Sequence, residues 1–273
     1  KVLGYHYITP ALKLVPDNSV HLIVTSPPYN VGMNYQVVDD RQPYQTYLNM
    51  LEDTFRECHR VLISGGRIAI NCPSTILQST YSRMAYLSID ILLLMRKIGF
   101  LDREMITWIK MKGGEIPSKS TAWGSWKSPS CCYMRDASEF IIIMDKGKHK
   151  REDKRGHNDI TTKEFLEYTS NVWSFSPEHD RSHPAPFPIE LPTRLLKLYS
   201  WQNDTVLDPF LGSGTTTAAA INTGRNSIGM EINSEYLSII KKKIKYGQVR
   251  FDEDVNIHIN NETKPLYTAS TNI

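Results

Sequence analysis

The stretch Val206–Ala220, "VLDPFLGSGTTTAAA", decides the fold of this chain. Its first part continues an apolar strand pattern over Asp204–Phe210, and its last part begins a helix of small residues over Gly214–Gly224. Gly212 and Gly214 allow a tight turn and a close approach of the backbone to a ligand. The first turn of the helix offers free N–H groups at the same place. A strand, a glycine turn and a helix in this order predict the ligand-binding edge of a parallel α/β sheet.

An acidic residue near the end of the next predicted strand strengthens this prediction. The next predicted strand, Asn226–Ile232, carries Glu231 near its end, where a carboxylate is placed to accept hydrogen bonds from two ribose hydroxyls. Asp208 bears on the choice of ligand, because an acid is unfavourable beside a pyrophosphate but can accept a hydrogen bond from an ammonium group. The charge match favours S-adenosylmethionine over a dinucleotide. For the glycine turn taken alone, an ordinary structural turn is the alternative.

Strand-like and helix-like segments alternate along most of the chain, which predicts an α/β protein with a doubly wound, mostly parallel sheet. Further strands are predicted at His21–Ser26, Arg67–Cys72, Glu104–Lys110 and Glu139–Gly147, and further helices at Tyr44–Leu62, Ser82–Phe100, Phe187–Ser200 and Ser234–Tyr246. Residues 111–135 and 148–182 are weakly patterned insertions. Beyond Tyr246 we expect a tail with at most a short strand over Val255–Ile259.

The loop "TSPPYN", Thr25–Asn30, follows the first buried strand. Its two prolines fix two φ angles and remove two backbone donors, so its side chains sit on a stiff support. The Ser26 hydroxyl and the Pro27 carbonyl can accept hydrogen bonds from an amine, and the Tyr29 ring can stack on a base. Placed at the same sheet edge as the glycine turn, these groups fit methyl transfer to the exocyclic amine of a nucleobase, which must be extruded from a duplex to be reached.

These segments together resemble the amino-methyltransferases that modify DNA. "TSPPY" is similar to the catalytic motif of that family, "VLDPFLGSGTT" to its S-adenosylmethionine motif, and "IGMEINSEYL" to the acidic motif that follows. "SHPAPFPIELPTRLLKLYS", "WGSWKSP" and "EFIIIMDKG" resemble further family segments. The catalytic motif precedes the glycine motif, which is the circularly permuted order of the family's β group.

The resemblance implies a seven-stranded sheet with one antiparallel hairpin strand, to which "EFIIIMDKG" would belong. It implies a methyltransferase domain formed by residues 1–147 and 183–250, with an inserted target-recognition region at 148–182. Loop 111–135 would contribute to recognition, and 251–273 would be a C-terminal tail.

The resemblance also implies site residues. Ser26, Pro27, Pro28 and Tyr29 would hold the flipped base. The cofactor would be held by Asp208, Pro209, Phe210, Gly212, Ser213, Gly214, Thr215, Glu231, Ile232 and His183.

The identity of the target base rests on one residue. A serine before Pro-Pro-Tyr is similar to the cytosine-N4 subgroup, whereas an aspartate is more typical of adenine-N6 enzymes. Serine is the weaker, neutral acceptor, but neither residue excludes the other base. Adenine N6 therefore stays open, as does an RNA or protein amino group, and a nicotinamide dehydrogenase is supported by the glycine turn alone. Cytosine C5 would need a thiolate, and Cys72 is expected to be a buried strand thiol.

Basic residues in the insertions are candidates for DNA contact. They are Lys148, Lys150, Arg151, Lys154 and Arg155 in the run Lys146–His157, with Lys119 and Lys127 in the preceding loop. A solvated charged loop is the alternative for the run. For Trp123 and Trp126 we favour ordinary packing over DNA contact.

Composition sets the remaining expectations. The formal net charge is +3, which does not by itself indicate a nucleic-acid partner. The four cysteines have no disulfide or CxxC spacing, which favours reduced thiols in the cytoplasm. We expect no membrane span and no metal. The expected partner is double-stranded DNA, and a homodimer and a cognate restriction endonuclease are further candidates.

Overall fold

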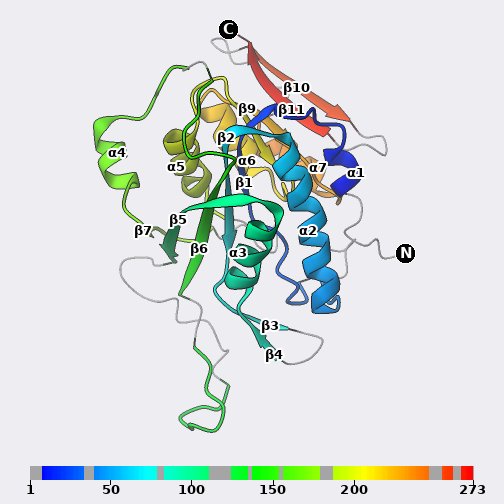
Figure 1. Ribbon diagram of the computed structural model, residues 1–273, viewed down its shortest axis with the longest axis vertical. Coiled ribbons are helices and arrows are strands. Elements are labelled where there is room, and N and C mark those ends of the chain that lie inside the picture. Colours follow the sequence, from blue (N-terminus) through cyan, green and yellow to red (C-terminus); the bar gives the residue numbers. More distant parts are fainter. Residues whose placement is uncertain are drawn as a thin grey trace.

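The computed structural model describes residues 8–33, 40–78, 83–110, 124–134, 137–153, 156–178, 187–245, 254–260 and 266–272. Nine strands of these ranges form one sheet in the order β10-β11-β9-β8-β1-β2-β6-β5-β7 (Figure 1). They are β1 (Val20–Thr25), β2 (Leu62–Cys72), β5 (Phe100–Ile109), β6 (Ser138–Lys146), β7 (Val172–Ser174), β8 (Thr205–Asp208), β9 (Asn226–Gly229), β10 (Asp254–Asn260) and β11 (Leu266–Asn272).

The sheet contains the predicted seven strands, with a C-terminal pair added at one edge. Without β10 and β11, the order is β9-β8-β1-β2-β6-β5-β7. The pairs β9–β8, β8–β1, β1–β2 and β5–β7 are parallel, whereas β6 is antiparallel to both β2 and β5. The predicted doubly wound, mostly parallel sheet is therefore confirmed, and β6 is the antiparallel strand expected from "EFIIIMDKG".

The C-terminal segment forms a hairpin rather than a loose tail. β10 and β11 pair antiparallel, and β11 pairs antiparallel with β9, with Tyr267 opposite Gly229. The sequence predicts only a short strand over Val255–Ile259. An edge hairpin takes its backbone hydrogen bonds from the neighbouring strand, so it does not require the apolar run by which a buried strand is recognised.

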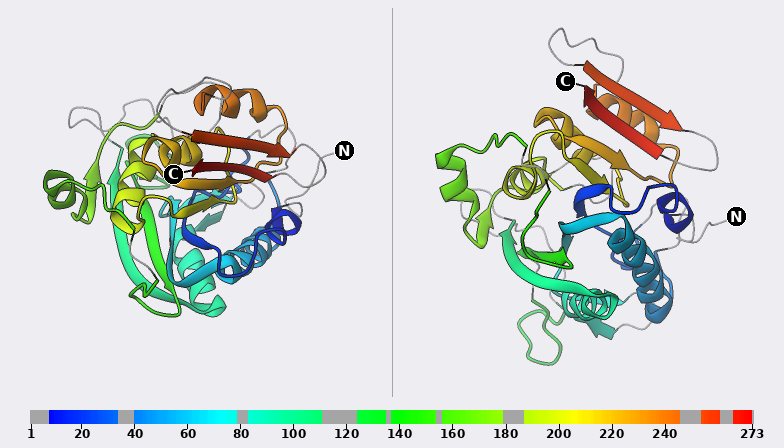
Figure 2. Two further views of the ribbon diagram at one scale, coloured as in Figure 1. Left: turned by 90° about the horizontal axis from the view of Figure 1, so that it is seen from above. Right: turned by 45° about the horizontal axis from the view of Figure 1, so that its top comes forward.

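Helices cover both faces of the sheet, which gives three layers (Figure 2). On one face, α1 (Ile8–Leu12), α2 (Tyr44–Val61) and α3 (Leu87–Ile98) pack into one apolar core. On the other face, α5 (Glu190–Tyr199) and α6 (Thr215–Asn222) pack into a second core, and α7 (Tyr236–Lys243) packs beside α6. No helix within the described ranges is long and apolar enough to cross a membrane.

Helices α2 and α3, on the first face, follow their sequence patterns with one difference. α2 buries Tyr47, Leu51, Phe55 and Cys58 along one stripe, as expected for an amphipathic helix. The second helix was predicted to begin at residue 82. It begins at Leu87 instead, because Arg83–Ala85 forms strand β4, which pairs with β3 (Ile76–Gln78).

The predicted recognition insertion, 148–182, contains two elements that the sequence pattern does not predict. Helix α4 (Thr162–Tyr168) begins with a capping box between Thr161 and Glu164. Strand β7 follows it and pairs parallel with β5 at the sheet edge. Part of the insertion therefore belongs to the sheet itself.

Candidate active site

β1 and β8 are neighbours in the sheet, and a ligand crevice is expected between their carboxyl ends. After β1 the chain enters α2 on one face, and after β8 it enters α6 on the opposite face. At such a reversal of strand order the two following loops separate and leave room for a ligand. The Ser-Pro-Pro-Tyr loop and the glycine turn therefore meet at one edge of the sheet.

A buried carboxylate joins these two loops. Asp208, at the end of β8, is fully buried, and its Oδ1 accepts a hydrogen bond of 2.7 Å from the Thr25 hydroxyl at the end of β1. The same oxygen accepts from the Phe210 N–H, and Oδ2 accepts from the Thr216 hydroxyl at 2.7 Å. Burial raises the pKa of Asp208 to about 6, and these three hydrogen bonds oppose the rise.

Asp208 thus differs from the sequence prediction in its role. Charge matching predicts that Asp208 accepts a hydrogen bond from the ammonium group of a ligand. Its carboxylate instead has no exposed surface and is engaged by three donors of the protein. Asp208 therefore fixes the spacing between the catalytic loop and the glycine turn.

The glycine turn lies beside Glu231, as the sequence predicts. Gly212 and Gly214 have φ angles of 55° and 85°, a left-handed conformation that glycine adopts without strain. The Gly212 N–H donates to Glu231 Oε2 at 2.8 Å, and the Asn233 N–H donates to Oε1 at 2.7 Å. Burial is the main cause that raises the pKa of Glu231 to about 7.

The other residues predicted to bind the cofactor differ in how far they are buried. Phe210 and Ile232 are half-buried and pack against the apolar core of the first face, whereas Pro209 is buried. The Ser213 and Thr215 hydroxyls are also buried, and Lys243 Nζ donates to both, at 2.8 and 3.0 Å. These two side chains therefore tie the turn to α7.

In the catalytic loop, Ser26 and Tyr29 form a pair. The Ser26 and Tyr29 hydroxyls are 2.7 Å apart, and Tyr29 Oη also lies 3.3 Å from Asn71 Nδ2. Pro27 is buried, whereas Ser26, Pro28 and Tyr29 are half-buried. The loop therefore presents its hydroxyl groups together at the edge of the crevice.

A polar network that the sequence analysis missed supports this pair. Asn71, near the end of β2, donates to Glu139 Oε2 at 2.5 Å, and Lys110 forms an ion pair with the same carboxylate. Asn71 and Glu139 are 3% and 8% exposed. Both are polar residues at the carboxyl-edge ends of otherwise apolar strands, and that is the signal by which a sequence search could find them.

A second missed residue fixes the end of the catalytic loop. The carboxylate of Asp40 accepts hydrogen bonds from the backbone N–H groups of Asn30, Val31, Gly32 and Met33, at 2.9 to 3.1 Å. Asn30 itself has a positive φ of 58°. Such convergent donors lock the loop directly after Tyr29 and limit its reorganisation during a reaction.

The predicted DNA contacts Lys148, Lys150 and Arg151 do not lie at this crevice. They follow β6, which runs against its neighbours, so the chain leaves β6 at the amino edge of the parallel strands. Arg151 is 8% exposed and forms ion pairs with Asp153 and Asp204. This part of the basic run is therefore separated from the catalytic loop by the length of the sheet.

The loop between β5 and β6, in contrast, leaves from the catalytic edge. Its described part, 124–134, projects at the bottom of Figure 1, beyond β3 and β4. Trp126 is 64% exposed and lies under Lys127, whose Nζ is 5.7 Å from the ring centroid. Packing, the role favoured for Trp126, is thus wrong. We call residues 124–134 the arm.

His183, Lys154, Arg155, Lys119 and Trp123 lie outside the described residues. Cys72 is fully buried at the end of β2, and burial raises the pKa of its thiol, as expected for a strand thiol.

One group within the described ranges has the geometry of a metal site. It consists of His21, Asp153 and Asp204, whose ligand atoms lie within 4.8 Å of one another. Arg151 already pairs with both carboxylates. The cluster is therefore explained by charge pairing.

Comparison of the sequence with known proteins identifies a family and several relatives. A family model described as DNA methylase, of the N6/N4 methyltransferase type, matches residues 20–242. The chain is 30% identical to type II methyltransferase M.HpaI of Haemophilus parainfluenzae, over 86% of this chain and 71% of that protein. It is 33% identical to type II methyltransferase M.MjaI of Methanocaldococcus jannaschii, over 90% and 92%. It is also 31% identical to the DNA adenine methyltransferase YhdJ of Escherichia coli, over 84% and 77%.

Solved structures share the fold. TTHA0409 of Thermus thermophilus, described as a candidate DNA modification methylase and solved with S-adenosyl-L-methionine, has a TM-score of 0.68 at 27% identity, over 88% of this chain and 94% of that one. The cytosine-N4-specific PvuII DNA methyltransferase has a TM-score of 0.67 at 19% identity, over 88% and 84%, which supports the fold alone. The crevice, the family match and these relatives agree: the chain belongs to the N6/N4 DNA methylase family and is a DNA methyltransferase whose cofactor is S-adenosylmethionine.

Proposed function

We propose that the chain transfers a methyl group from S-adenosylmethionine to the exocyclic N4 amine of a cytosine extruded from double-stranded DNA at a specific site. The observation that carries this proposal is the hydrogen bond between Thr25 and Asp208. It joins the Ser-Pro-Pro-Tyr loop to the glycine turn at the reversal of strand order. A methyl donor held at the turn is thereby placed beside the acceptors of the loop.

The residues around the turn fit the expected cofactor. The Glu231 carboxylate accepts backbone N–H groups through both oxygens and has further acceptor capacity, so it can accept a hydrogen bond from a ribose hydroxyl. The half-buried side chains of Phe210 and Ile232 offer an apolar surface to a purine ring. When bound, S-adenosylmethionine supplies an electrophilic methyl group.

The catalytic loop acts on the amine that receives the methyl group. The lone pair of an exocyclic amine is delocalised into the ring, which makes the nitrogen a poor nucleophile. Acceptance of its hydrogens by Ser26 Oγ and the Pro27 carbonyl favours a more tetrahedral, more nucleophilic nitrogen. Asp40 and the network of Asn71 and Glu139 hold these acceptors in place, so little reorganisation is needed during the reaction.

DNA approaches from the edge that carries the arm. Lys127 supplies a cation for backbone phosphates, and the exposed Trp126 supplies a ring that can stack on a base. Lys148, Lys150 and Arg151 are left out of this interface because they lie at the opposite edge. The predicted recognition role is therefore assigned here to the arm.

Cytosine is proposed because Ser26 is a neutral acceptor, as in the subgroup that the Ser-Pro-Pro-Tyr motif resembles. Adenine N6 is the second candidate, since YhdJ, an adenine enzyme by name, is 31% identical to this chain. Because two of the relatives are type II methyltransferases by name, we further propose a restriction endonuclease of the same specificity as a functional partner.

The test is methyl transfer from S-adenosylmethionine labelled in its methyl group to a DNA library that contains all short sites. We expect label in duplex DNA and none in tRNA or ribosomal protein added as competing acceptors. Ser26→Ala should slow the transfer while the folded protein still binds the cofactor. Labelling of RNA or protein in preference to DNA would refute the proposal.

A further inference from the structure

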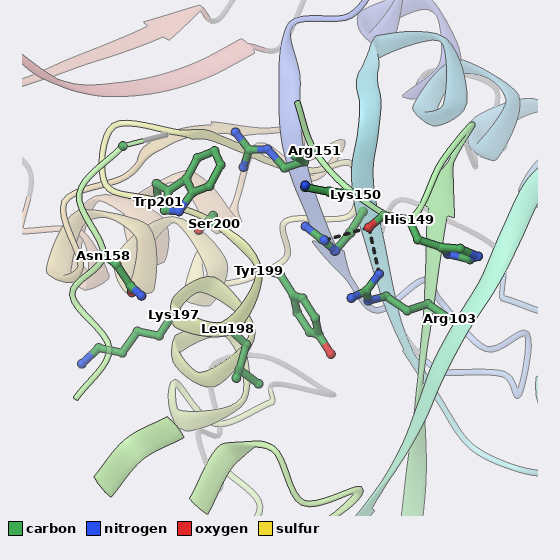
Figure 3. A pocket seen from close by; sticks show the side chains of 12 residues that line it. Arg103, His149, Lys150, Arg151, Asn158, Lys197, Leu198, Tyr199, Ser200 and Trp201 are labelled. Carbon is green, nitrogen blue, oxygen red and sulfur yellow. Dashed lines mark hydrogen bonds between the residues drawn. The ribbon is translucent and has the colours of Figure 1, made fainter. Parts of the chain in front are cut away.

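The basic run at the amino edge of the sheet lines a cavity that the methyltransferase reaction does not use. The cavity has a volume of about 640 Å³, within the range of small-molecule sites. Arg67 of β2 and Arg103 of β5 line it, together with Lys150 and Arg151 after β6 and Tyr199 at the end of α5. In Figure 3 the Tyr199 ring lies near the middle of the view, with Arg103 on one side and Trp201 on the other.

Two guanidinium groups are gathered at one wall of this cavity. Arg67 Nη2 and Arg103 Nη1 donate to the same backbone oxygen of His149, at 3.2 and 3.1 Å, as the dashed lines in Figure 3 show. The Cζ atoms of both arginines lie over the Tyr199 ring, 5.5 and 5.8 Å from its centroid. Such close cations repel each other unless an anion lies between them.

The carboxylate of Asp145 pairs with both arginines. Asp145 is fully buried and lies 3.4 Å from Arg67 Nε and 3.0 Å from Arg103 Nη1, and it also contacts the His149 ring at 2.7 Å. Guanidinium groups carry more N–H donors than these contacts use. Among the described residues, Arg103 Nε is buried without a hydrogen-bond partner. Lys150 adds an exposed cation to the same cavity.

We propose that this cavity is a phosphate-binding site, separate from the methyl-transfer crevice, that takes the phosphate groups of a free nucleotide or of a nucleic-acid backbone. The planar fork of a guanidinium matches two oxygens of a phosphate group, and two adjacent forks suit a chain of phosphates. The faces of Tyr199 and Trp201 that Arg67, Arg103 and Arg151 cover are closed to base stacking, so the phosphate part of the ligand carries the recognition.

The site is tested by calorimetric titration of the full chain with inorganic pyrophosphate, in the presence of saturating S-adenosylmethionine. We expect saturable binding of one pyrophosphate per chain, because the two sites lie at opposite edges of the sheet. Arg103→Gln should weaken it at least tenfold. Lys150→Gln should also weaken it, and because Lys150 is exposed this variant tests the site without disturbing the core. Lys163→Gln, which removes an exposed cation of α4, is the charge-matched control and should bind as wild type.

A short single-stranded DNA without the target base separates the two sources of phosphate. If pyrophosphate binds and Arg103→Gln leaves the affinity for the strand unchanged, the ligand is a free phosphate compound. If the variant loses affinity for the strand, a nucleic-acid backbone also occupies the site. If neither ligand binds saturably, or if Lys163→Gln weakens binding as much as Arg103→Gln, the proposal is overturned.

Discussion

Ser26 and Tyr29 pair with each other in the structure, so their hydroxyl groups are preorganised before any base arrives. The distance of 2.7 Å between these oxygens fits one strong hydrogen bond. An incoming amine would exchange this bond for its own, with the backbone held by two prolines and by Asp40. Ser26, the residue to which we assign the choice of base, is therefore held by its neighbours before a substrate binds.

Ser26→Ala should lower kcat by about 10²-fold, because it removes an acceptor whose hydrogen bond strengthens as the amine becomes tetrahedral. The KM for DNA should change little, since we assign contact with the duplex to the arm and not to Ser26. Steady-state methylation rates measure both constants. Ser238→Ala, in α7, is the matched control and should behave as wild type. A kcat of Ser26→Ala equal to that of wild type would refute the assigned role.

Because the pKa of Glu231 is raised, we predict that cofactor binding depends on pH. Its pKa, raised to about 7 by burial, leaves a large share of the carboxyl protonated at pH 6. Ribose hydroxyls donate to the ionised form, so binding releases a proton, and affinity should rise as the pH increases from 6 to 8. Calorimetry in buffers of different ionisation enthalpy measures that proton.

Glu231→Gln should bind the cofactor more weakly and without this pH dependence, because the amide does not titrate. A wild-type affinity that falls between pH 6 and 8 would contradict the assignment of Glu231 to the ribose.

At the scale of elements, the end of β1 is tied to the end of β8 through Thr25 and Asp208. Thr25→Val removes the donor and leaves the buried carboxylate with fewer partners, which should cost about 1–3 kcal/mol of unfolding free energy. Because the two loops lose their common anchor, we also expect kcat/KM to fall about tenfold. Thermal unfolding and methylation kinetics test the two effects.

Thr54→Val separates the two effects. Thr54 is also fully buried, but its hydroxyl bonds only within α2, so this variant should lose stability and keep its activity. Equal catalytic losses in the two variants would show that Thr25 acts through stability alone.

The arm is the element we assign to DNA. Trp126→Ala should weaken binding to target duplex about tenfold, by the loss of a stacking surface, and leave the affinity for S-adenosylmethionine unchanged. Fluorescence anisotropy with a labelled duplex measures this. Phe165→Ala, an exposed aromatic in α4, is the control. Unchanged duplex binding by Trp126→Ala would remove the arm from the interface.

At the scale of the whole molecule, the direction of one strand explains why the two motif loops lie at one edge of the sheet and part of the basic run lies at the other. The glycine turn, Glu231 and the Ser-Pro-Pro-Tyr loop all follow strands that run the same way, so the periodic pattern alone brings them to one edge. Lys148 and Arg151 follow β6, which runs the other way. The family resemblance implies that β6 is antiparallel. The positive charge of the loop after β6, however, does not show at which edge of the sheet that loop lies.

The elements that the sequence missed are those with little local pattern. β7 has only three residues, and its place is set by pairing with β5. The C-terminal hairpin is likewise set by pairing with β9. Asn71, Glu139 and Asp40 join the catalytic loop from three other segments, so their contacts depend on the completed fold. Long-range pairing of this kind leaves no periodic signal in the chain.

The most direct test of the central claim is the identity of the methylated base. Plasmid DNA lacking methylation is incubated with the protein and S-adenosylmethionine, digested to nucleosides and examined by mass spectrometry. We expect N4-methylcytosine, formed by the wild type and formed about 10²-fold more slowly by Ser26→Ala. N6-methyladenine as the only product, or no methylated nucleoside from any DNA, would contradict it.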